Sequence, residues 1–167
     1  MKEIMRHIKN NSFAAVYLLY GDEDYLKTSY KNRLREAVCG EDTMNLSVYQ
    51  GRDVPVAEVA DIARTMPFFA ERRLIVIEDS GLFKGASEEM TETVKELPDT
   101  AVLLFVESEV DKRGRLYKAV NEKGYVCEMK RQTEAALRDW AARIFGGAGK
   151  RITRNDMDSF LARAGDD

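Results

Sequence analysis

Residues 20–28 carry most of the residue types of a phosphate-binding loop. Such a loop has the spacing G-x-x-x-x-G-K-[ST], in which backbone N–H groups and the lysine hold the phosphates. Gly21, Lys27 and Thr28 are in register, but Leu26 replaces the second glycine. The acidic run 22–24 fills the turn, and its carboxylates would repel a polyphosphate. The segment is therefore predicted to be a capped first helical turn, with Lys27 and Thr28 as chance matches or relics.

A pair of carboxylates follows a later apolar run and suggests the second half of a nucleotide site. Glu78 and Asp79 come directly after the aliphatic run 74–77, where they could hold Mg²⁺ and polarise a water molecule. Ser108 follows the run 101–106, at the place of a polar sensor residue, although this signal is weak. An active nucleotide hydrolase that uses Lys27 and Thr28 with this carboxylate pair is kept as the alternative function.

The segment 65–69 has the chemistry of protein recognition rather than catalysis. Met66, Phe68 and Phe69 surround Pro67 at the end of a predicted helix. Adjacent residues point in different directions in a helix or strand, so both aromatic rings cannot easily be buried on one face. Two interpretations stay open: the rings cap the core of the sheet, or they form an exposed contact that enters a pocket of a partner.

The composition excludes several classes of protein. The chain has 167 residues with 26 Lys and Arg, 29 Asp and Glu, and 44% hydrophobic residues. This length is about that of one domain with a real core. A net charge of −3 does not fit a protein that coats nucleic acid by bulk charge. No apolar run approaches the roughly 20 residues of a membrane span, and residues 1–11 lack the apolar stretch of a secretory signal.

Cysteine and histidine are too scarce for several kinds of site. Cys39 and Cys127 cannot make a disulfide framework, and with His7 as the single histidine they do not suggest a zinc site. A catalytic Ser/His/Asp or Cys/His arrangement is disfavoured for the same reason. We expect two packed thiols, a surface histidine on the opening helix, a cytoplasmic protein, and no metal, cofactor or catalytic residue.

Short apolar runs alternate with amphipathic segments over residues 1–129. Strands are predicted at 14–20, 44–49, 74–77, 101–106 and 125–129, and helices at 24–38, 53–66, 86–97 and 113–121. Asp53 is predicted to cap the second of these helices, with Pro55 in its first turn. This alternation predicts an α/β fold with a parallel five-stranded sheet between flanking helices.

The pattern changes near Lys130. Helices are predicted at 132–145 and 153–164, with a loop at 146–149 and no further strand. Acidic residues outnumber basic ones before this point, and the reverse holds after it. Two helices alone bury little apolar surface. We therefore predict an α/β domain over 1–130 and the truncated start of an all-α domain over 131–167.

Several segments together resemble the delta subunit family of bacterial DNA polymerase III. They are YLLYGDEDYL (17–26), TMPFFAERRLIVIED (65–79), VDKRGRLYK (110–118) and the helical start beyond 132. The resemblance covers nearly the whole chain in order. It implies an AAA+-type α/β domain with a degenerate phosphate loop and then a helical lid domain. A C-terminal collar domain would be missing, so the chain resembles an N-terminal fragment, expected to be monomeric.

The resemblance also implies a function. The family is known as the part of the clamp loader that does not bind ATP itself and that binds and opens the sliding clamp during DNA replication. Its hydrophobic clamp-binding pair maps onto Phe68 and Phe69, with Met66 and Pro67 beside them. The implied partners are the sliding clamp (the beta subunit), other clamp-loader subunits and primer–template DNA. The protein would be no enzyme by itself, but a subunit of a DNA-directed DNA polymerase holoenzyme, a nucleotidyltransferase.

A basic stretch offers a third, weaker interpretation. Lys112, Arg113, Arg115 and Lys118 could contact nucleic acid or a neighbouring subunit. A solvated surface is the simpler explanation of the same residues.

Overall fold

The computed structural model describes residues 1–131, 135, 138–139 and 141–143. The chain divides into two compact units, Met1–Met129 and Lys130–Asp167. The predicted loop at 146–149, the predicted helix at 153–164 and most of the helix at 132–145 lie outside the described residues, so the lid assignment stays a prediction.

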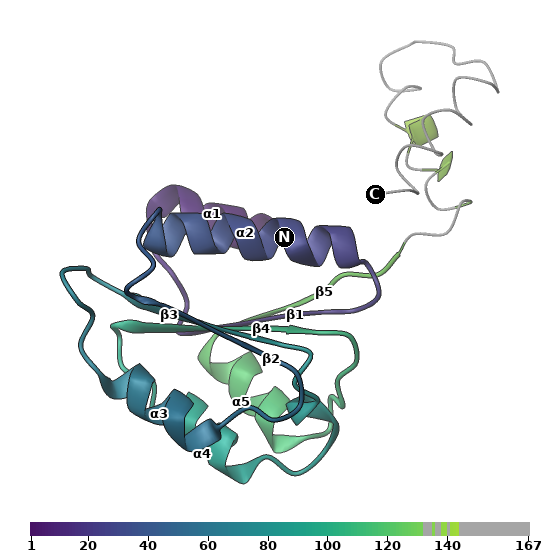
Figure 1. Cartoon of the computed structure of the whole chain (residues 1–167). Coiled ribbons are helices and arrows are strands. Elements are labelled where there is room, and N and C mark those ends of the chain that lie inside the picture. Colours follow the sequence, from purple (N-terminus) through teal and green to yellow (C-terminus); the bar gives the residue numbers. More distant parts are fainter. Residues whose placement is uncertain (132–134, 136–137, 140, 144–167) are drawn as a thin grey trace. The chain divides into compact units, whose positions relative to one another are not determined.

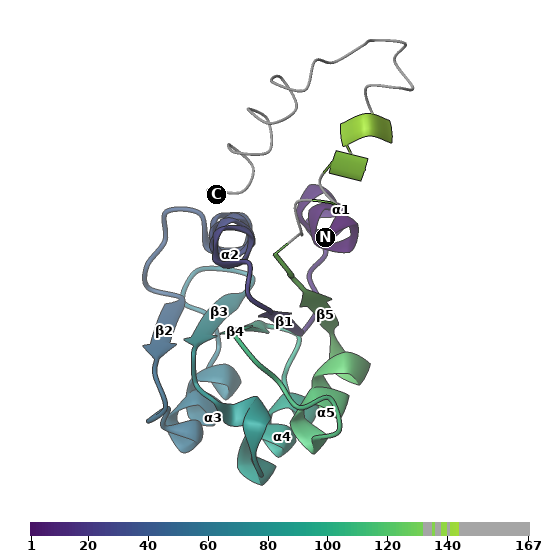
Figure 2. The same ribbon diagram turned by 90° about the vertical axis from the view of Figure 1, so that its right-hand side faces the viewer.

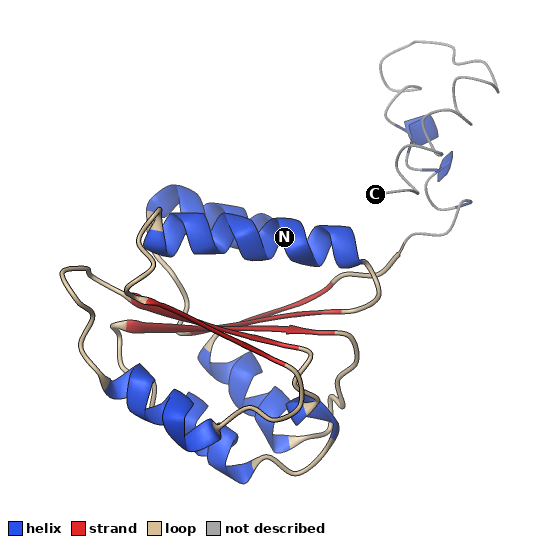
Figure 3. Cartoon of the chain, viewed as in Figure 1, coloured by secondary structure: helices blue, strands red, loops and turns tan. Residues whose placement is uncertain are grey.

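The first unit alternates helices and strands. The helices are α1 (Lys2–Asn10), α2 (Asp24–Cys39), α3 (Val56–Arg64), α4 (Glu88–Lys95) and α5 (Arg115–Lys123), with a short 3-10 helix η1 (Leu82–Lys84). The strands are β1 (Val16–Tyr20), β2 (Leu46–Gln50), β3 (Arg73–Glu78), β4 (Ala101–Glu107) and β5 (Tyr125–Glu128). They form one sheet in the order β2-β3-β4-β1-β5, and every neighbouring pair is parallel. Figure 3 shows this sheet between two layers of helices. The predicted α/β class and five-stranded parallel sheet are confirmed.

The helices cover both faces of the sheet. Helices α1 and α2 lie on one face, and α3, α4 and α5 lie on the other (Figures 1 and 2). Alternate side chains of β1 therefore enter two cores: Leu18 packs with Phe83 and Phe105 on the α3–α5 side, whereas Leu19 packs with Leu34 on the α1–α2 side. Burial on both faces explains why β1 and β4 are continuously apolar.

Several predicted boundaries differ from the structure, including both ends of α3 and the start of α5. Helix α3 begins at Val56 with an extended Pro55 before it, and no side chain caps it. Pro55 itself occupies the N-cap position, so Asp53 lies two residues too early to cap this helix. Helix α3 ends at Arg64 because Pro67 disfavours helical geometry just before it. Helix α5 begins at Arg115 rather than Arg113, after an extended Gly114.

The scarce residues are found near their expected places. Cys127 is buried and Cys39 half-buried, so both are packed thiols. His7 is not a simple surface residue, because its Nδ1 lies 2.7 Å from the hydroxyl of Tyr17 in a half-buried contact. No helix in the described part of the chain is long and apolar enough to cross a bilayer.

Candidate protein-binding site

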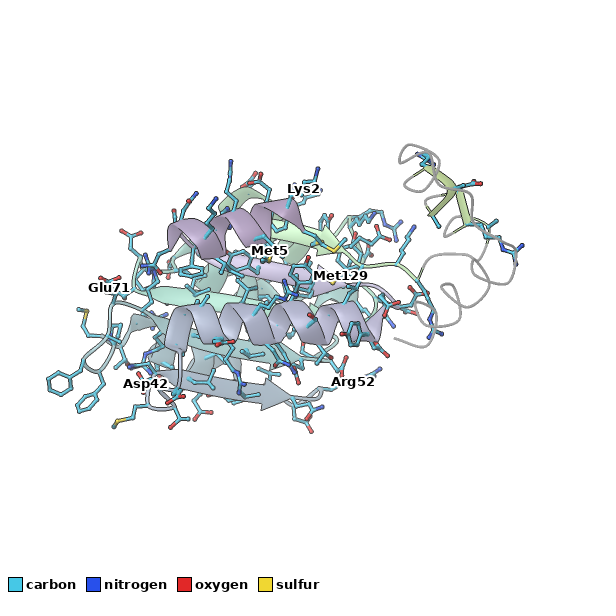
Figure 4. The ribbon with its side chains drawn as sticks, turned by 90° about the horizontal axis from the view of Figure 1, so that it is seen from above. Lys2, Met5, Asp42, Arg52, Glu71 and Met129 are labelled. Atoms are coloured by element: carbon cyan, nitrogen blue, oxygen red, sulfur yellow. The ribbon has the colours of Figure 1, made fainter. Side chains whose placement is uncertain are left out.

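The phosphate-loop segment and the segment 65–69 lie at opposite ends of the strands of the sheet. The phosphate-loop segment follows β1, at the carboxyl edge of the parallel strands. The loop 65–72, called the tip loop below, joins α3 to β3 and therefore lies at the amino edge. In Figure 4, Asp42 and Glu71 mark the amino edge, and Arg52 and Met129 lie at the other end of the unit. The two segments therefore cannot form one composite site.

The tip loop exposes its large apolar side chains. Phe69 is 94% exposed, Met66 72% and Phe68 52%. The two aromatic rings, called the aromatic pair below, contact each other edge to face with centroids 4.5 Å apart. Both rings are exposed and neither caps the core, while a contact with a partner stays a prediction. Such a cluster is typical of a protein-interaction site.

Two side chains hold the backbone of the tip loop: Asn45, just before β2, and Arg73, at the start of β3. The Asn45 side chain donates from Nδ2 to the Phe68 carbonyl at 2.8 Å, and its Oδ1 accepts from the Phe68 N–H at 2.7 Å. The Arg73 guanidinium donates to the carbonyl oxygens of Thr65 and Met66, at 3.3 and 3.2 Å. Sequence reasoning missed Asn45, which stands 23 residues before its partner.

The end of the tip loop is attached to the segment that precedes β1. The Arg72 guanidinium lies 5.2 Å from the centroid of the Phe13 ring and donates to the Asn11 carbonyl at 3.4 Å. A cation over an aromatic face attracts the ring quadrupole. With Asn45 and Arg73, this contact fixes the tip loop at its start, middle and end. The loop is therefore a preformed surface feature.

Several backbone donors of the phosphate-loop segment are already occupied. The N–H of Gly21 donates to Ser108 O at 3.1 Å, and the N–H of Glu23 donates to Met129 O at 3.0 Å. The Glu23 carboxylate accepts from the Tyr25 N–H as a helix cap. A Cβ on Gly21 would lie 2.2 Å from Met129 O, so the chain after β5 fills the space beside this turn. These contacts favour the predicted capped turn over a phosphate cradle.

Lys27 points into the protein, where it has partners. Its side chain is 6% exposed, and Nζ donates to the Glu107 carbonyl at 3.2 Å and pairs with Asp24 at 3.1 Å. The sequence interpretation of Lys27 as a chance match or relic misses this structural role. The ammonium satisfies the last carbonyl of β4 instead of facing the solvent.

Glu78 ends β3 and Asp79 follows it, and the two carboxylates have different surroundings. Glu78 pairs with Lys31 at 2.6 Å, whereas Asp79 is exposed with φ 50°. Ser108 is exposed and contributes its carbonyl, not its hydroxyl, to the Gly21 turn. Among the described residues, no group of three or more His, Cys, Asp or Glu side chains is arranged to hold a metal ion.

The sequence of this chain matches the model of one protein family. The family model described as "DNA polymerase III, delta subunit" matches residues 17–130. The chain belongs to the DNA polymerase III delta subunit family. The matched range contains both the capped turn after β1 and the tip loop.

Individual relatives agree with this family. The chain is 28% identical over 155 residues to the DNA polymerase III subunit delta of Bacillus subtilis, covering 85% of this chain and 45% of the relative. A solved structure of the Bacillus subtilis DNA clamp loader delta protein has a TM-score of 0.77 at 22% identity, covering 96% of this chain and 51% of the other. The chain thus spans about half the length of these delta relatives.

More distant structures share the fold. A DNA polymerase III gamma subunit-related protein of Thermotoga maritima has a TM-score of 0.55 at 12% identity, covering 84% of this chain and 49% of the other. A Thermotoga maritima RuvB mutant has a TM-score of 0.54 at 15% identity, covering 95% of this chain and 52% of the other. At these identities the likeness concerns the fold alone, and it fits the AAA+-like fold that the delta resemblance implies.

Three residues of the basic stretch in this delta-family chain are paired with acidic ones. Lys112 lies 3.6 Å from Glu128, and Arg115 lies 3.7 Å from Glu88. Arg113 pairs with Asp111 at 3.1 Å, and this bond lowers the pKa of the Asp111 carboxyl. Arg113 and Arg115 share a pocket of about 580 Å³ with η1 and α4, whereas Lys112 lies over the Tyr20 ring. This pattern resembles a solvated, charge-balanced surface, and nucleic-acid contact stays a prediction.

A buried carboxylate at the end of β4 was not found from the sequence. Glu107 is 2% exposed, and its carboxylate accepts hydrogen bonds from the backbone N–H and the hydroxyl of Ser80. Burial raises the pKa of Glu107 above its usual value despite these bonds. The predicted strand 101–106 stopped one residue short, which placed this side chain outside the core.

Because the pKa of Glu107 is raised, its contribution to the free energy of unfolding should depend on pH. The pKa of Glu107 is higher in the folded chain than in the unfolded chain, so the folded state holds the proton more tightly. This contribution to stability is fully present below pH about 4.5 and is lost as pH rises through the folded pKa. The free energy of unfolding of Glu107→Gln, relative to the original chain, is therefore expected to increase from pH 4 to pH 7. Urea unfolding of both proteins across this range measures the difference. A difference independent of pH would contradict the prediction.

Proposed function

We propose that this chain is the clamp-binding part of a clamp-loader delta subunit that does not hydrolyse ATP. In this proposal Met66, Pro67, Phe68 and Phe69 bind the sliding clamp and help to open it during DNA replication in the cytoplasm. Other clamp-loader subunits and primer–template DNA are the further partners of the full-length protein. The observation that carries the proposal is the exposure of Phe69, 94%, on a loop fixed to the sheet. Family membership supports it.

The chemistry of the tip loop suits an apolar pocket on the clamp. Full burial of one phenylalanine side chain stabilises a complex by about 1.5–3 kcal/mol, and aromatic anchors often dominate an interface. The bonds from Asn45 and Arg73 order the loop before it binds, which lowers the entropy lost on binding. Binding here opens the clamp only if the contacts are better in the open state than in the closed state.

Titration of this chain with the sliding clamp of the same organism tests the proposal. We expect saturable binding by calorimetry, and unchanged binding by the control variant Tyr25→Ala. Tyr25 is a suitable control because it is 57% exposed and lies on α2, at the opposite edge of the sheet. Absence of binding by the unchanged chain would overturn the proposal.

The nucleotide alternative leads to a separate prediction. We expect no saturable heat when Mg·ATP is titrated into the chain, because the N–H groups of Gly21 and Glu23 and the Lys27 ammonium already have protein partners. Lys27→Ala is expected to lower the free energy of unfolding by about 1–3 kcal/mol, because it removes buried contacts. Lys27→Met, which keeps the apolar stem, is expected to cost less. ATP binding that disappears in Lys27→Met would contradict the prediction.

A further inference from the structure

We infer that Asn45 is the positioning residue of the aromatic pair, and that the clamp-binding surface extends across it to Met44. This inference rests on the proposed function. Its basis is a link between two chain segments, 42–45 and 65–69, which are brought together at the amino edge of β2 and β3.

Asn45 acts as a substitute for a neighbouring strand. Its side chain is fully buried and binds both the N–H and the carbonyl of Phe68, as a backbone partner in a ladder would. Its second Nδ2 hydrogen goes to Asp42 Oδ2 at 2.7 Å. Its own carbonyl accepts from the N–H of Leu74, the second residue of β3, at 2.9 Å. The position of Phe68 is thereby fixed to the sheet itself.

The residue after Phe68 shows why such a support is needed. Phe69 has φ 52°, in the left-handed region that costs a residue with a Cβ about 1–2 kcal/mol. In this conformation the Phe69 ring is exposed and contacts the Phe68 ring edge to face. Without the two bonds to Phe68, the middle of the loop loses its support although Arg73 and Arg72 still hold its ends, and relaxation there to an extended conformation would redirect the Phe69 ring. Asn45 therefore determines the direction in which the aromatic pair is presented.

Asparagine is the side chain that these contacts require. Nδ2 must donate to two oxygens, those of Phe68 and Asp42, while Oδ1 must accept from an N–H. Aspartate has the size and the acceptor, but its second oxygen would face a carbonyl and a carboxylate as a third acceptor. Alanine leaves the part-buried N–H and carbonyl of Phe68 without these partners, which costs free energy.

Met44 lies next to this link and is exposed. Its side chain is 65% exposed, and its N–H donates to Asp42 Oδ1 at 2.8 Å, which fixes the turn before β2. Because Asn45 holds the Phe68 backbone, Met44 lies one residue along the chain from a side chain that contacts the tip loop. An unbranched thioether side chain adapts to irregular apolar surfaces. We therefore assign one partner to the enlarged surface, the same apolar pocket of the clamp that binds the aromatic pair.

The first test measures local order and affinity in Asn45→Ala. We expect the Phe68 amide to exchange with solvent at least about 10-fold faster by NMR, while the Leu104 amide of the central strand is unchanged. Affinity for the clamp is expected to fall by about 10-fold. If Asn45→Ala does not fold, Asn45→Asp keeps the size and the acceptor and provides the same measurements. Unchanged Phe68 exchange or unchanged affinity in the folded variant overturns the inference.

A double-mutant cycle separates positioning from general stability. If Asn45 acts through the aromatic pair, its replacement in a Phe69→Ala background should lower the remaining affinity by less than about 3-fold. A full 10-fold loss in that background would show an independent effect and overturn the positioning role. Met44→Ala is expected to weaken binding by about 3- to 10-fold, whereas Met5→Ala on α1 should have no effect. If Met44→Ala and Met5→Ala have equal effects on affinity, Met44 is not part of the clamp-binding surface.

The outcomes also distinguish this inference from the proposed function. If replacing both aromatic residues leaves clamp binding intact, the proposed function fails and this inference fails with it. If that replacement abolishes binding but Asn45→Ala and Met44→Ala do not weaken it, only this inference fails.

Discussion

Replacing Phe68 and Phe69 together with alanine is expected to lower affinity for the sliding clamp by about 100-fold or more, with the fold intact. The rings are 52% and 94% exposed, so they bury little surface within the chain. In a clamp pocket, two phenylalanine side chains contribute about 3–6 kcal/mol together, which corresponds to roughly 100- to 10,000-fold in affinity. The effect on binding should therefore greatly exceed the effect on stability.

Two measurements make this prediction strict. Urea unfolding of the double variant should give a free energy within about 0.5 kcal/mol of the original value, as is usual for exposed sites. Calorimetric titration with the clamp should show the loss of binding, with Tyr25→Ala as the exposed aromatic control. A double variant that binds as tightly as the original chain would exclude the aromatic pair from the interface.

The sequence predicts the fold well because the sheet is buried on both faces. Strands β1 and β4 have no solvent-facing side, so their residues form continuous apolar runs that are easy to recognise. Helix ends are predicted less well, because they depend on local backbone geometry. The turn before α3 shows this: Asp53 has the chemistry of a cap, but the helix begins later and Pro55 occupies the cap position.

The candidate site is predictable only in part. The adjacency of Phe68 and Phe69 already indicates that both rings are hard to bury together. The role of Asn45 is not visible, since an asparagine before a strand is common and its partner is distant in sequence. Lys27 and Glu107 are similar cases, because their burial depends on where β4 and the turn after β1 meet. Contacts between distant segments carry no periodic signal.

The second large effect is expected at a glycine that approaches β1 closely. In Gly124→Ala, the new Cβ would lie 1.8 Å from the Val16 carbonyl oxygen and 2.7 Å from Val16 Cγ1. Gly124 immediately precedes β5, which pairs with β1 from Tyr17 onward, so neither backbone is free to move alone. Relief of the clash requires displacing β5 or β1. We expect a loss of about 3 kcal/mol or more in the free energy of unfolding, measured with urea.

A matched glycine shows whether the clash, and not the change of residue type, is responsible. Gly85 has no heavy atom within 4 Å of an added Cβ and has φ −152°, so Gly85→Ala should change stability by about 0.5 kcal/mol or less. Equal stabilities of the two variants would show that the close approach of Gly124 to β1 relaxes without cost. Because the tip loop depends on β2 and β3 for its position, Gly124→Ala should lose clamp binding only under conditions where it unfolds. The Phe68 and Phe69 double variant should instead lose binding while fully folded, which separates damage to the sheet from damage to the surface that it supports.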